Sequence, residues 1–392
     1  MPYRLIVTVV TLLLAGCGSY ETITSPSKWF ETEDNIDPPA ELVVLKDDVE
    51  VRTLWSTSVG KGTKGQRLEL APHVSNDMVY VADSRGNVVA LNTASGDLVW
   101  EVDTELPLSG GPGAGVGLVL VGSRDGDVVA LDAASGKEKW RKRVSSEILS
   151  VPQADQGMVI IHTMDGSLVG LDASTGEQIW DYKRSVPVLS LRGSSSPVIS
   201  GTTVICGFAS GKLVAFNLSN GDLLWEASIS PPTGRTELER MVDIDGELAV
   251  VDGVIYAATF QGDLAAVSAE TGVVLWRRSM SSHAGVGADL RQIYISDDED
   301  HVWAVEPRNG AALWKQKKLH GRKLSAPAVL GSFILVGDFE GYVHWLSIED
   351  GSLVARSRVG DDPISTPPII DNGVAYIYGD GGDLAAFRES AN

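Results

Sequence analysis

The chain has 392 residues, of which 43% are hydrophobic, with 42 glycines, 17 prolines and 10 tryptophans. This composition provides for a large buried core but contains too many turn-forming residues for a helical protein. The formal net charge of −20, from 32 basic and 52 acidic residues, argues against a folded body that binds nucleic acid or anionic lipid.

The first 17 residues, MPYRLIVTVVTLLLAGC, have the pattern of a secretory signal. One positive residue, Arg4, precedes an apolar run that ends at Leu14 and is too short for a permanent membrane span. The stretch LAGC that ends at Cys17 resembles the bacterial lipobox, in which the thiol is acylated and becomes the mature N-terminus. We therefore predict a lipoprotein signal peptide at 1–16 and lipidation at Cys17. The alternative is an ordinary signal peptide with a chance cysteine.

Residues 17–48 are polar and contain proline, as expected of a lipid-anchored tether. The residue after Cys17 is Gly18 rather than Asp. In the sorting pattern that such lipoproteins resemble, this indicates the outer membrane.

A 15-residue phrase recurs through the rest of the chain, and such a repeat determines the architecture. Seven copies are clear, and an eighth begins at 382 and stops half way. The seven are GNVVALNTASGDLVW (86–100), GDVVALDAASGKEKW (126–140), GSLVGLDASTGEQIW (166–180), GKLVAFNLSNGDLLW (211–225), GDLAAVSAETGVVLW (262–276), DHVWAVEPRNGAALW (300–314) and GYVHWLSIEDGSLVA (341–355).

Each repeat is predicted to hold four strands, including a VVAL-type strand, a turn closed by glycine and a strand that carries tryptophan. A period near 40 residues with four strands is typical of a β-propeller blade. The truncated eighth copy lacks its last strand, and the segment VEVRTLWSTSV at 49–59 has no blade of its own. We therefore predict an all-β, eight-bladed β-propeller at 49–392, closed by the N-terminal strand joining the C-terminal blade.

The tryptophans recur at one position of the repeat, and the seventh copy has Ala355 instead. A four-stranded blade cannot bury both faces alone, so we predict that these side chains dock one blade on the next. A buried indole covers roughly 150–250 Å² of surface, worth on the order of 4–6 kcal/mol before entropy. The predicted docking residues are Trp55, Trp100, Trp140, Trp180, Trp225, Trp276 and Trp314.

No catalytic constellation is evident. The six histidines lack metal-site spacing, so no zinc site is predicted, and Cys206 lies in an apolar strand where a buried, inert thiol is expected. The acidic stretch DDED at 297–300 is interpreted as a solvated turn, with a calcium site as the alternative. We expect no enzyme activity, cofactor or metal.

The repeat period lengthens at two connections, where function is expected. The first insert, 185–196, contains Leu189, Leu191 and Arg192, and the second, 230–247, contains Asp243 and Asp245. Both connect an outer strand to the next inner strand and flank one blade, so we predict that they are neighbours. Apolar anchors beside cations and carboxylates favour a protein-binding patch, although loops that merely vary in length are the alternative.

The lipobox, the tether, eight PQQ-like repeats and the stretches LSLRGSSSPV and TELERMVDID together resemble the BamB family. That family is the lipoprotein propeller of the machinery that inserts β-barrels into the bacterial outer membrane. The resemblance implies a non-enzymatic scaffold on the periplasmic side that aids folding and insertion of outer-membrane proteins. It also implies that Leu189, Leu191, Arg192, Asp243 and Asp245 bind the periplasmic domains of the barrel-forming subunit BamA, with unfolded outer-membrane proteins as further partners.

The repeats also resemble those of quinone-dependent dehydrogenases, which gives an enzyme as the alternative function. Those enzymes bind pyrroloquinoline quinone and calcium, often beside a disulfide of adjacent cysteines, and this chain has no adjacent cysteine pair. An envelope module that binds polysaccharide is a further alternative, although no aromatic platform stands outside the repeat register.

Overall fold

The computed structural model describes residues 37–45, 49–187 and 189–390. The chain divides into two compact units, Met1–Pro38 and Pro39–Asn392. The predicted signal peptide, Cys17 and most of the predicted tether lie outside the described residues. All secondary-structure elements in the described part are β-strands. The described residues contain no helix that is long and apolar enough to cross a membrane.

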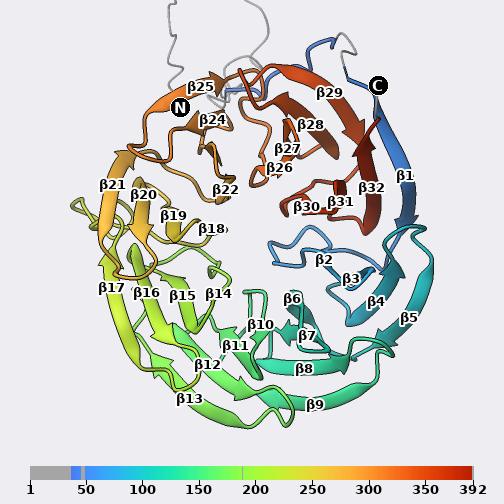
Figure 1. The fold of residues 1–392 in the computed structure, drawn as a ribbon, viewed down its shortest axis with the longest axis vertical. Helices are drawn as coiled ribbons and strands as arrows, with labels where there is room; N and C mark the ends of the chain where they lie inside the picture. The colour runs from blue at the N-terminus through green and yellow to red at the C-terminus, as the bar shows by residue number, and fades with distance from the viewer. Residues whose placement is uncertain (1–36, 46–48, 188, 391–392) are drawn as a thin grey trace, which may run out of the picture. The chain divides into compact units, whose positions relative to one another are not determined.

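The strands of the second unit form eight antiparallel sheets of four strands, arranged as a ring of blades (Figure 1). In blades 1 to 7, which contain β2 to β29, the strands of each blade follow one another in chain order from the innermost to the outermost. Blade 1 contains β2 (His73–Ser75), β3 (Met78–Ala82), β4 (Asn87–Asn92) and β5 (Leu98–Asp103); blade 2 contains β6 (Leu108–Gly115), β7 (Leu118–Ser123), β8 (Asp127–Asp132) and β9 (Glu138–Arg143); blade 3 contains β10 (Gln153–Asp155), β11 (Met158–His162), β12 (Ser167–Asp172) and β13 (Gln178–Lys183); blade 4 contains β14 (Val198–Ser200), β15 (Thr203–Phe208), β16 (Lys212–Asn217) and β17 (Leu223–Ser228).

The remaining blades repeat this pattern, except that the outer strand of blade 8 comes from the N-terminal side of the chain. Blade 5 contains β18 (Ala249–Val251), β19 (Val254–Ala258), β20 (Asp263–Ser268) and β21 (Val274–Ser279); blade 6 contains β22 (Val286–Ala288), β23 (Ile293–Ser296), β24 (Val302–Val305) and β25 (Ala312–Gln316); blade 7 contains β26 (Ala328–Leu330), β27 (Phe333–Gly337), β28 (Tyr342–Ser347) and β29 (Leu353–Arg358); blade 8 contains β30 (Ile369–Asp371), β31 (Val374–Tyr378), β32 (Asp383–Glu389) and β1 (Val51–Ser58).

The ring closes where β1 pairs antiparallel with β32, from Val51 opposite Glu389 to Ser58 opposite Asp383. Figure 1 shows β1 and β32 side by side in this blade. The predicted eight-bladed fold and its closure by the N-terminal strand are therefore confirmed.

The hydrophobic core is divided among the spaces between neighbouring blades. The side chains of blades 2 and 3, for example, form one buried cluster that includes Leu120, Val128 and Ile161. Each blade thus buries its faces only against its neighbours, as expected of a repeat fold.

Each docking tryptophan reaches the next blade in the same way. Its indole N–H donates a hydrogen bond of 2.7–3.1 Å to a carbonyl oxygen in the turn between the third and fourth strands of that blade. The donor and acceptor pairs are Trp55 with Thr93, Trp100 with Ala133, Trp140 with Ala173, Trp180 with Leu218, Trp225 with Ala269, Trp276 with Pro307 and Trp314 with Ile348. These are the contacts between blades that the predicted docking role of the tryptophans requires.

The glycine that closes each of these turns lies against the docked indole. Gly176, for example, has φ +72°, and a Cβ built on it would lie 2.7 Å from the ring of Trp140. The same contact, at 2.4–2.8 Å, recurs in every turn that receives a tryptophan. The position therefore requires glycine both for its left-handed backbone and for the close approach of the indole.

Ala355 replaces tryptophan in the seventh repeat because its neighbour is blade 8. The third strand of that blade, β32, ends the described chain, and the fourth, β1, comes from the N-terminal side, so no turn joins them. Trp345 lies opposite Ala355 in the sheet and is fully buried. Elsewhere the residue opposite the tryptophan is small, as with Ala130 and Trp140, so blade 7 has exchanged the large and the small side chain.

The strand directions divide the connections between two faces of the ring. The links between blades lie on the same face as the turns between second and third strands, and we call this the link face. Its links are 59–72, 104–107, 144–152, 184–197, 229–248, 280–285, 317–327 and 359–368. The turns that receive the tryptophans lie on the opposite face.

The segment 39–45, which precedes β1, is fastened to blades 6 and 7. The backbone N–H of Ala40 donates to the carbonyl of His320 at 2.8 Å, and Arg322 donates to the carbonyl of Ala40 at 3.1 Å. Arg356 donates to the carbonyl of Val43 at 3.2 Å. The last part of the predicted tether is thus bonded to the ring rather than free of it.

A pair of glycine substitutions in blade 3 tests the docking contact. Gly157 and Gly176 both have positive φ, at +79° and +72°, but nothing lies within 4 Å of a Cβ at Gly157. Both alanine variants should lose about 1 kcal/mol to backbone strain. Gly176→Ala should lose roughly a further 1–3 kcal/mol, because its methyl group displaces Trp140.

Thermal unfolding followed by circular dichroism measures the difference. Gly176→Ala should have the clearly lower midpoint, with Gly157→Ala close to the wild type. Equal midpoints for the two variants would show that the indole contact does not hold the blades together.

Candidate functional site: two long links on one face

The two inserts lie on either side of blade 4 and contact each other. The carboxylate of Asp243, in the second insert, accepts a hydrogen bond of 2.6 Å from the backbone N–H of Leu191 in the first insert. Its other oxygen accepts from the N–H of Ser210, in the turn after β15, at 3.1 Å. The prediction that the inserts are neighbours is confirmed.

Arg192 extends this contact to two further links. Its guanidinium donates to the carbonyl of Arg67 at 2.9 Å and to the carboxylate of Glu147 at 2.6 Å. Arg67 belongs to the link 59–72, which equals 184–197 in length but was not singled out as an insert. The signal was present in the sequence, because Trp55 and Trp100 are separated by the same 45 residues as Trp180 and Trp225.

The second insert contains an exposed turn with its own hydrogen bonds. The hydroxyl of Thr236 accepts from the N–H of Glu239, and the Glu239 carboxylate accepts from the N–H of Thr236, both at 3.2 Å. This reciprocal pair is a capping box, which fixes the turn without help from the rest of the ring. It presents Leu238, which is 61% exposed, between Arg235 and Arg240, which are also exposed.

The five predicted binding residues therefore occupy different environments. Leu189 is 47% exposed, and Arg192 is exposed as well. Leu191 is half-buried. Asp243 is buried with both oxygens bonded, so it positions the first insert rather than offering a charge to a partner.

Asp245 borders the interior of the ring. It lies against Gly193 of the first insert, where an added Cβ would come within 3.1 Å of its side chain. Burial, and then the charge of Asp243, raise the pKa of Asp245 to about 7. One of its carboxylate oxygens is buried without a hydrogen-bond partner in the described structure.

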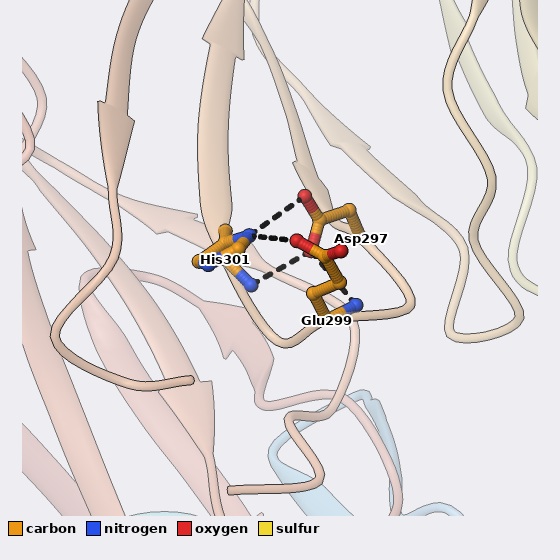
Figure 2. Close-up of side chains that lie close together, drawn as sticks. All are labelled: Asp297, Glu299 and His301. Carbon is orange, nitrogen blue, oxygen red and sulfur yellow. Dashed lines mark hydrogen bonds and ion pairs between the residues drawn. The ribbon is translucent and has the colours of Figure 1, made fainter. Parts of the chain in front are cut away.

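The acidic turn at 297–300 brings together Asp297, Glu299 and His301 (Figure 2). Nδ1 of His301 lies 3.1 Å from a carboxylate oxygen of Asp297 and 3.3 Å from one of Glu299. One ligand atom from each residue lies within 4.8 Å of the others, so the three form a candidate metal-binding group. Sequence spacing had indicated no zinc site here and a calcium site only as an alternative.

The contacts of Asp297 are nevertheless those of a structural turn. One oxygen accepts from the N–H groups of Glu299 and His301, and the other accepts from the indole N–H of Trp303 at 2.7 Å. The ammonium group of Lys315 lies 3.6 Å from that second oxygen and would repel a bound cation. Asp83 and Asp338 accept the equivalent two backbone hydrogen bonds in blades 1 and 7. The Asp297 carboxylate is therefore a recurring structural feature of the blades.

Cys206 is fully buried in β15, as predicted, and burial raises the pKa of its thiol. Its sulfur lies 3.3 Å from Nδ1 of His162, whose pKa burial lowers. The thiol is therefore protonated and unreactive at neutral pH.

The described structure is an eight-bladed β-propeller whose long links lie on one face. The family model "Outer membrane protein assembly factor BamB" matches residues 41–107, 84–316 and 304–391, and the chain belongs to this family. A relative with that description from Alkalilimnicola ehrlichii is 51% identical over 98% of this chain and 96% of its own length. One from Escherichia coli is 34% identical over 95% of this chain and 97% of its own length.

Solved structures of the same family and of dehydrogenases share this fold. The crystal structure of BamB from Moraxella catarrhalis is 27% identical, with a TM-score of 0.79 over 86% of this chain and all of that chain. A quinohemoprotein alcohol dehydrogenase from Comamonas testosteroni has a TM-score of 0.68 over 87% of this chain and 77% of its own, at 15% identity. That likeness is one of fold alone. The relatives are described as assembly factors, in agreement with the expectation of a non-enzymatic protein.

The contact between Asp243 and Leu191 can be tested with a nearly isosteric substitution. In Asp243→Asn, one of the two acceptor oxygens becomes an amide that cannot accept a hydrogen bond, so the N–H of Leu191 or Ser210 loses its partner at a cost of about 1–3 kcal/mol. We expect faster amide hydrogen exchange in 189–193, with exchange in β15 and β16 little changed. Mass spectrometry of peptic fragments measures both.

Asp245→Asn is the matched control. Its unpartnered oxygen loses no hydrogen bond, so exchange in 189–193 should stay close to that of the wild type. If Asp243→Asn behaves like this control, Asp243 does not hold the insert.

Proposed function

We propose that this protein is a non-enzymatic scaffold in the assembly of outer-membrane β-barrel proteins. Relatives that match this chain over nearly their whole length are described as outer-membrane protein assembly factors. In this proposal the link face binds the periplasmic domains of the barrel-forming subunit BamA. The ring holds that subunit in place and so aids the folding and insertion of its substrates.

The observation that carries the proposal is the arrangement of the inserts. They present Leu189 and Leu238 to solvent, and the same two inserts carry the exposed side chains of Arg192, Arg235 and Arg240. Exposed leucines flanked by arginines have the composition of a protein-binding surface. On a chain with a net charge of −20, these cations favour acidic groups on the partner.

The loops are also organised before any partner arrives. Asp243 fixes Leu191, Arg192 is bonded to two other links, and the capping box fixes the turn at Thr236. A surface that is ordered in advance loses less conformational entropy on binding. This favours a role in recognition over the alternative that these links merely vary in length.

The proposed location is the periplasmic side of the outer membrane, with acylated Cys17 as the anchor. The lipobox and Gly18 support it, together with the outer-membrane description of the relatives. Mass spectrometry of the protein purified from membranes, with Cys17→Ser as the comparison, tests the acylation directly.

Binding to the purified periplasmic domains of the barrel-forming subunit tests the surface. Arg192→Glu should weaken the complex by about tenfold or more, because it reverses an exposed charge of the first insert and breaks the contact with Glu147. Leu189→Asp should weaken it to a similar degree by placing a charge at an apolar contact. Surface plasmon resonance measures both affinities.

Arg308→Glu is the matched control. It makes the same charge change at a side chain that is 92% exposed, in the turn between β24 and β25 on the opposite face. Its affinity should equal that of the wild type. Absence of binding by the wild-type protein, or equal weakening by Arg308→Glu, would contradict the proposal.

A further inference from the structure

The centre of the ring contains a cavity that the proposed scaffold role does not use. Its volume is about 440 Å³, within the range of small-molecule sites. It is lined by the links that lead into blades 1, 4, 5, 6, 7 and 8 and by the turns between β27 and β28 and between β31 and β32. Only a site on the axis of the ring can touch so many blades, so the cavity lies in the central tunnel at the link face.

Two glutamates approach this cavity from opposite sides. Glu69 precedes the inner strand of blade 1 and is bridged to Gly110, and Glu247 precedes the inner strand of blade 5 and is bridged to Gly285. Blades 1 and 5 are opposite in a ring of eight, as β2 and β18 show in Figure 1. Both carboxylates line the cavity, and neither has a hydrogen-bond or ion-pair partner among the described residues.

Further carboxylates line the same space, and the cations that line it do not neutralise them. Asp245 contributes its unpartnered oxygen, and Asp380 accepts one hydrogen bond, of 2.6 Å, from Ser365. Arg67 and Lys323 are exposed, and within the described structure neither forms an ion pair with these acids. His283, the remaining titratable group in the lining, pairs with Asp298 instead.

The electrostatics of the glutamates reflect this shortage of cations. Burial, and then the charge of Glu247, raise the pKa of Glu69 to about 8, against a smaller opposing effect of Arg67. Burial also raises the pKa values of Glu247 and Asp380. Part of this charge is therefore neutralised by bound protons at neutral pH, and a cationic ligand could take their place.

The rest of the lining favours an organic cation over a bare metal ion. Leu68, Leu324, Phe339 and Ile364 give the cavity apolar walls, and its volume far exceeds that of one ion. A polycarboxylate quinone would meet four acidic side chains, so the lining does not fit the cofactor of the enzymes that share this fold.

We propose that the tunnel cavity is a binding site for an organic cation, whose ammonium or guanidinium group lies between Glu69 and Glu247. The aliphatic part of the ligand packs on the apolar walls, and the two carboxylates accept its charged hydrogen bonds. This chemistry occurs in free polyamines and in the lysine or arginine side chains of polypeptides. Gly193 and Asp245 of the two inserts line the cavity, whereas the exposed leucines and arginines of the patch do not.

Isothermal titration calorimetry of the full chain in detergent tests the site with two probes. Spermidine represents the free polyamines, and the capped tripeptide Gly-Arg-Gly represents a polypeptide side chain. We expect at least one probe to bind, and Glu69→Gln and Glu247→Gln each to weaken it by about tenfold or more. The probe that binds identifies the source of the cation.

Glu299→Gln controls for diffuse attraction to an acidic protein. Glu299 has a 70% exposed side chain on the link face outside the cavity lining, so this variant removes the same charge without touching the site. Its affinity should match that of the wild type. Equal weakening by Glu299→Gln, or no binding of either probe, would overturn the proposal, whereas binding to the barrel-forming subunit would be unaffected by that result.

Proton release gives a second readout that does not depend on affinity. At pH 7.5 most of Glu69 is protonated, so a bound cation should expel protons from the wild-type cavity. Calorimetry in two buffers of different ionisation enthalpy measures this number. Glu69→Gln should release fewer protons than the wild type, and equal release would place the cation elsewhere.

The pH dependence of stability tests the burial of Glu69 without a ligand. Between pH values of about 5 and 8 the unfolded chain has lost this proton and the folded chain retains it, so stability falls as pH rises. Glu69→Gln removes that linkage, although Asp245, Glu247 and Asp380 remain. Its unfolding midpoint should fall less between about pH 5 and pH 9 than that of the wild type. Parallel pH curves for the two proteins would contradict the burial.

Discussion

The structure depends on one contact, repeated seven times around the ring. An indole N–H donates to a carbonyl oxygen in the next blade, and the ring of the same indole packs on a turn glycine, where an added Cβ would overlap it. Every blade except blades 7 and 8 both contributes a tryptophan to the next blade and receives one from the previous blade. No blade is therefore stable without its neighbours. The exception follows from closure, since β32 and β1 are joined by hydrogen bonds and not by a turn that could receive an indole.

Because these contacts constrain the strands of the blades, the connections between the blades are the parts that vary in length. The blades repeat their strands almost residue for residue, whereas the links differ several-fold in length. Each link begins and ends on a fixed strand, so a long link is held at both ends, and a few side chains suffice to order it. Asp243 and Arg192 do this for the inserts, and the link face becomes a rigid surface whose shape is set by loops.

The fold was predictable because its determinants are local and repeated. Each blade carries the docking tryptophan, the turn glycine or both, and the unpaired strand at 49–59 could only complete the truncated eighth blade. The two inserts were also visible in the sequence, because the spacing between successive repeats lengthens there. The burial of Asp243 was not, because an aspartate in a polar loop has no sequence signature that distinguishes a buried acceptor from a solvated charge. Glu69 and Glu247 were missed for a related reason, since each lies beside leucine in a pattern typical of a strand, and only the closed ring brings them together.

The attachment of segment 39–45 determines how the disc responds to a pull from its N-terminal side. Tension would first load the hydrogen bonds that Arg322 and Arg356 make to this segment, on blades 6 and 7. The seam between β1 and β32 lies farther along the chain and would remain unloaded until those bonds yield. These bonds would thus keep tension on the preceding chain away from the joint between β1 and β32, which no turn connects in the described structure.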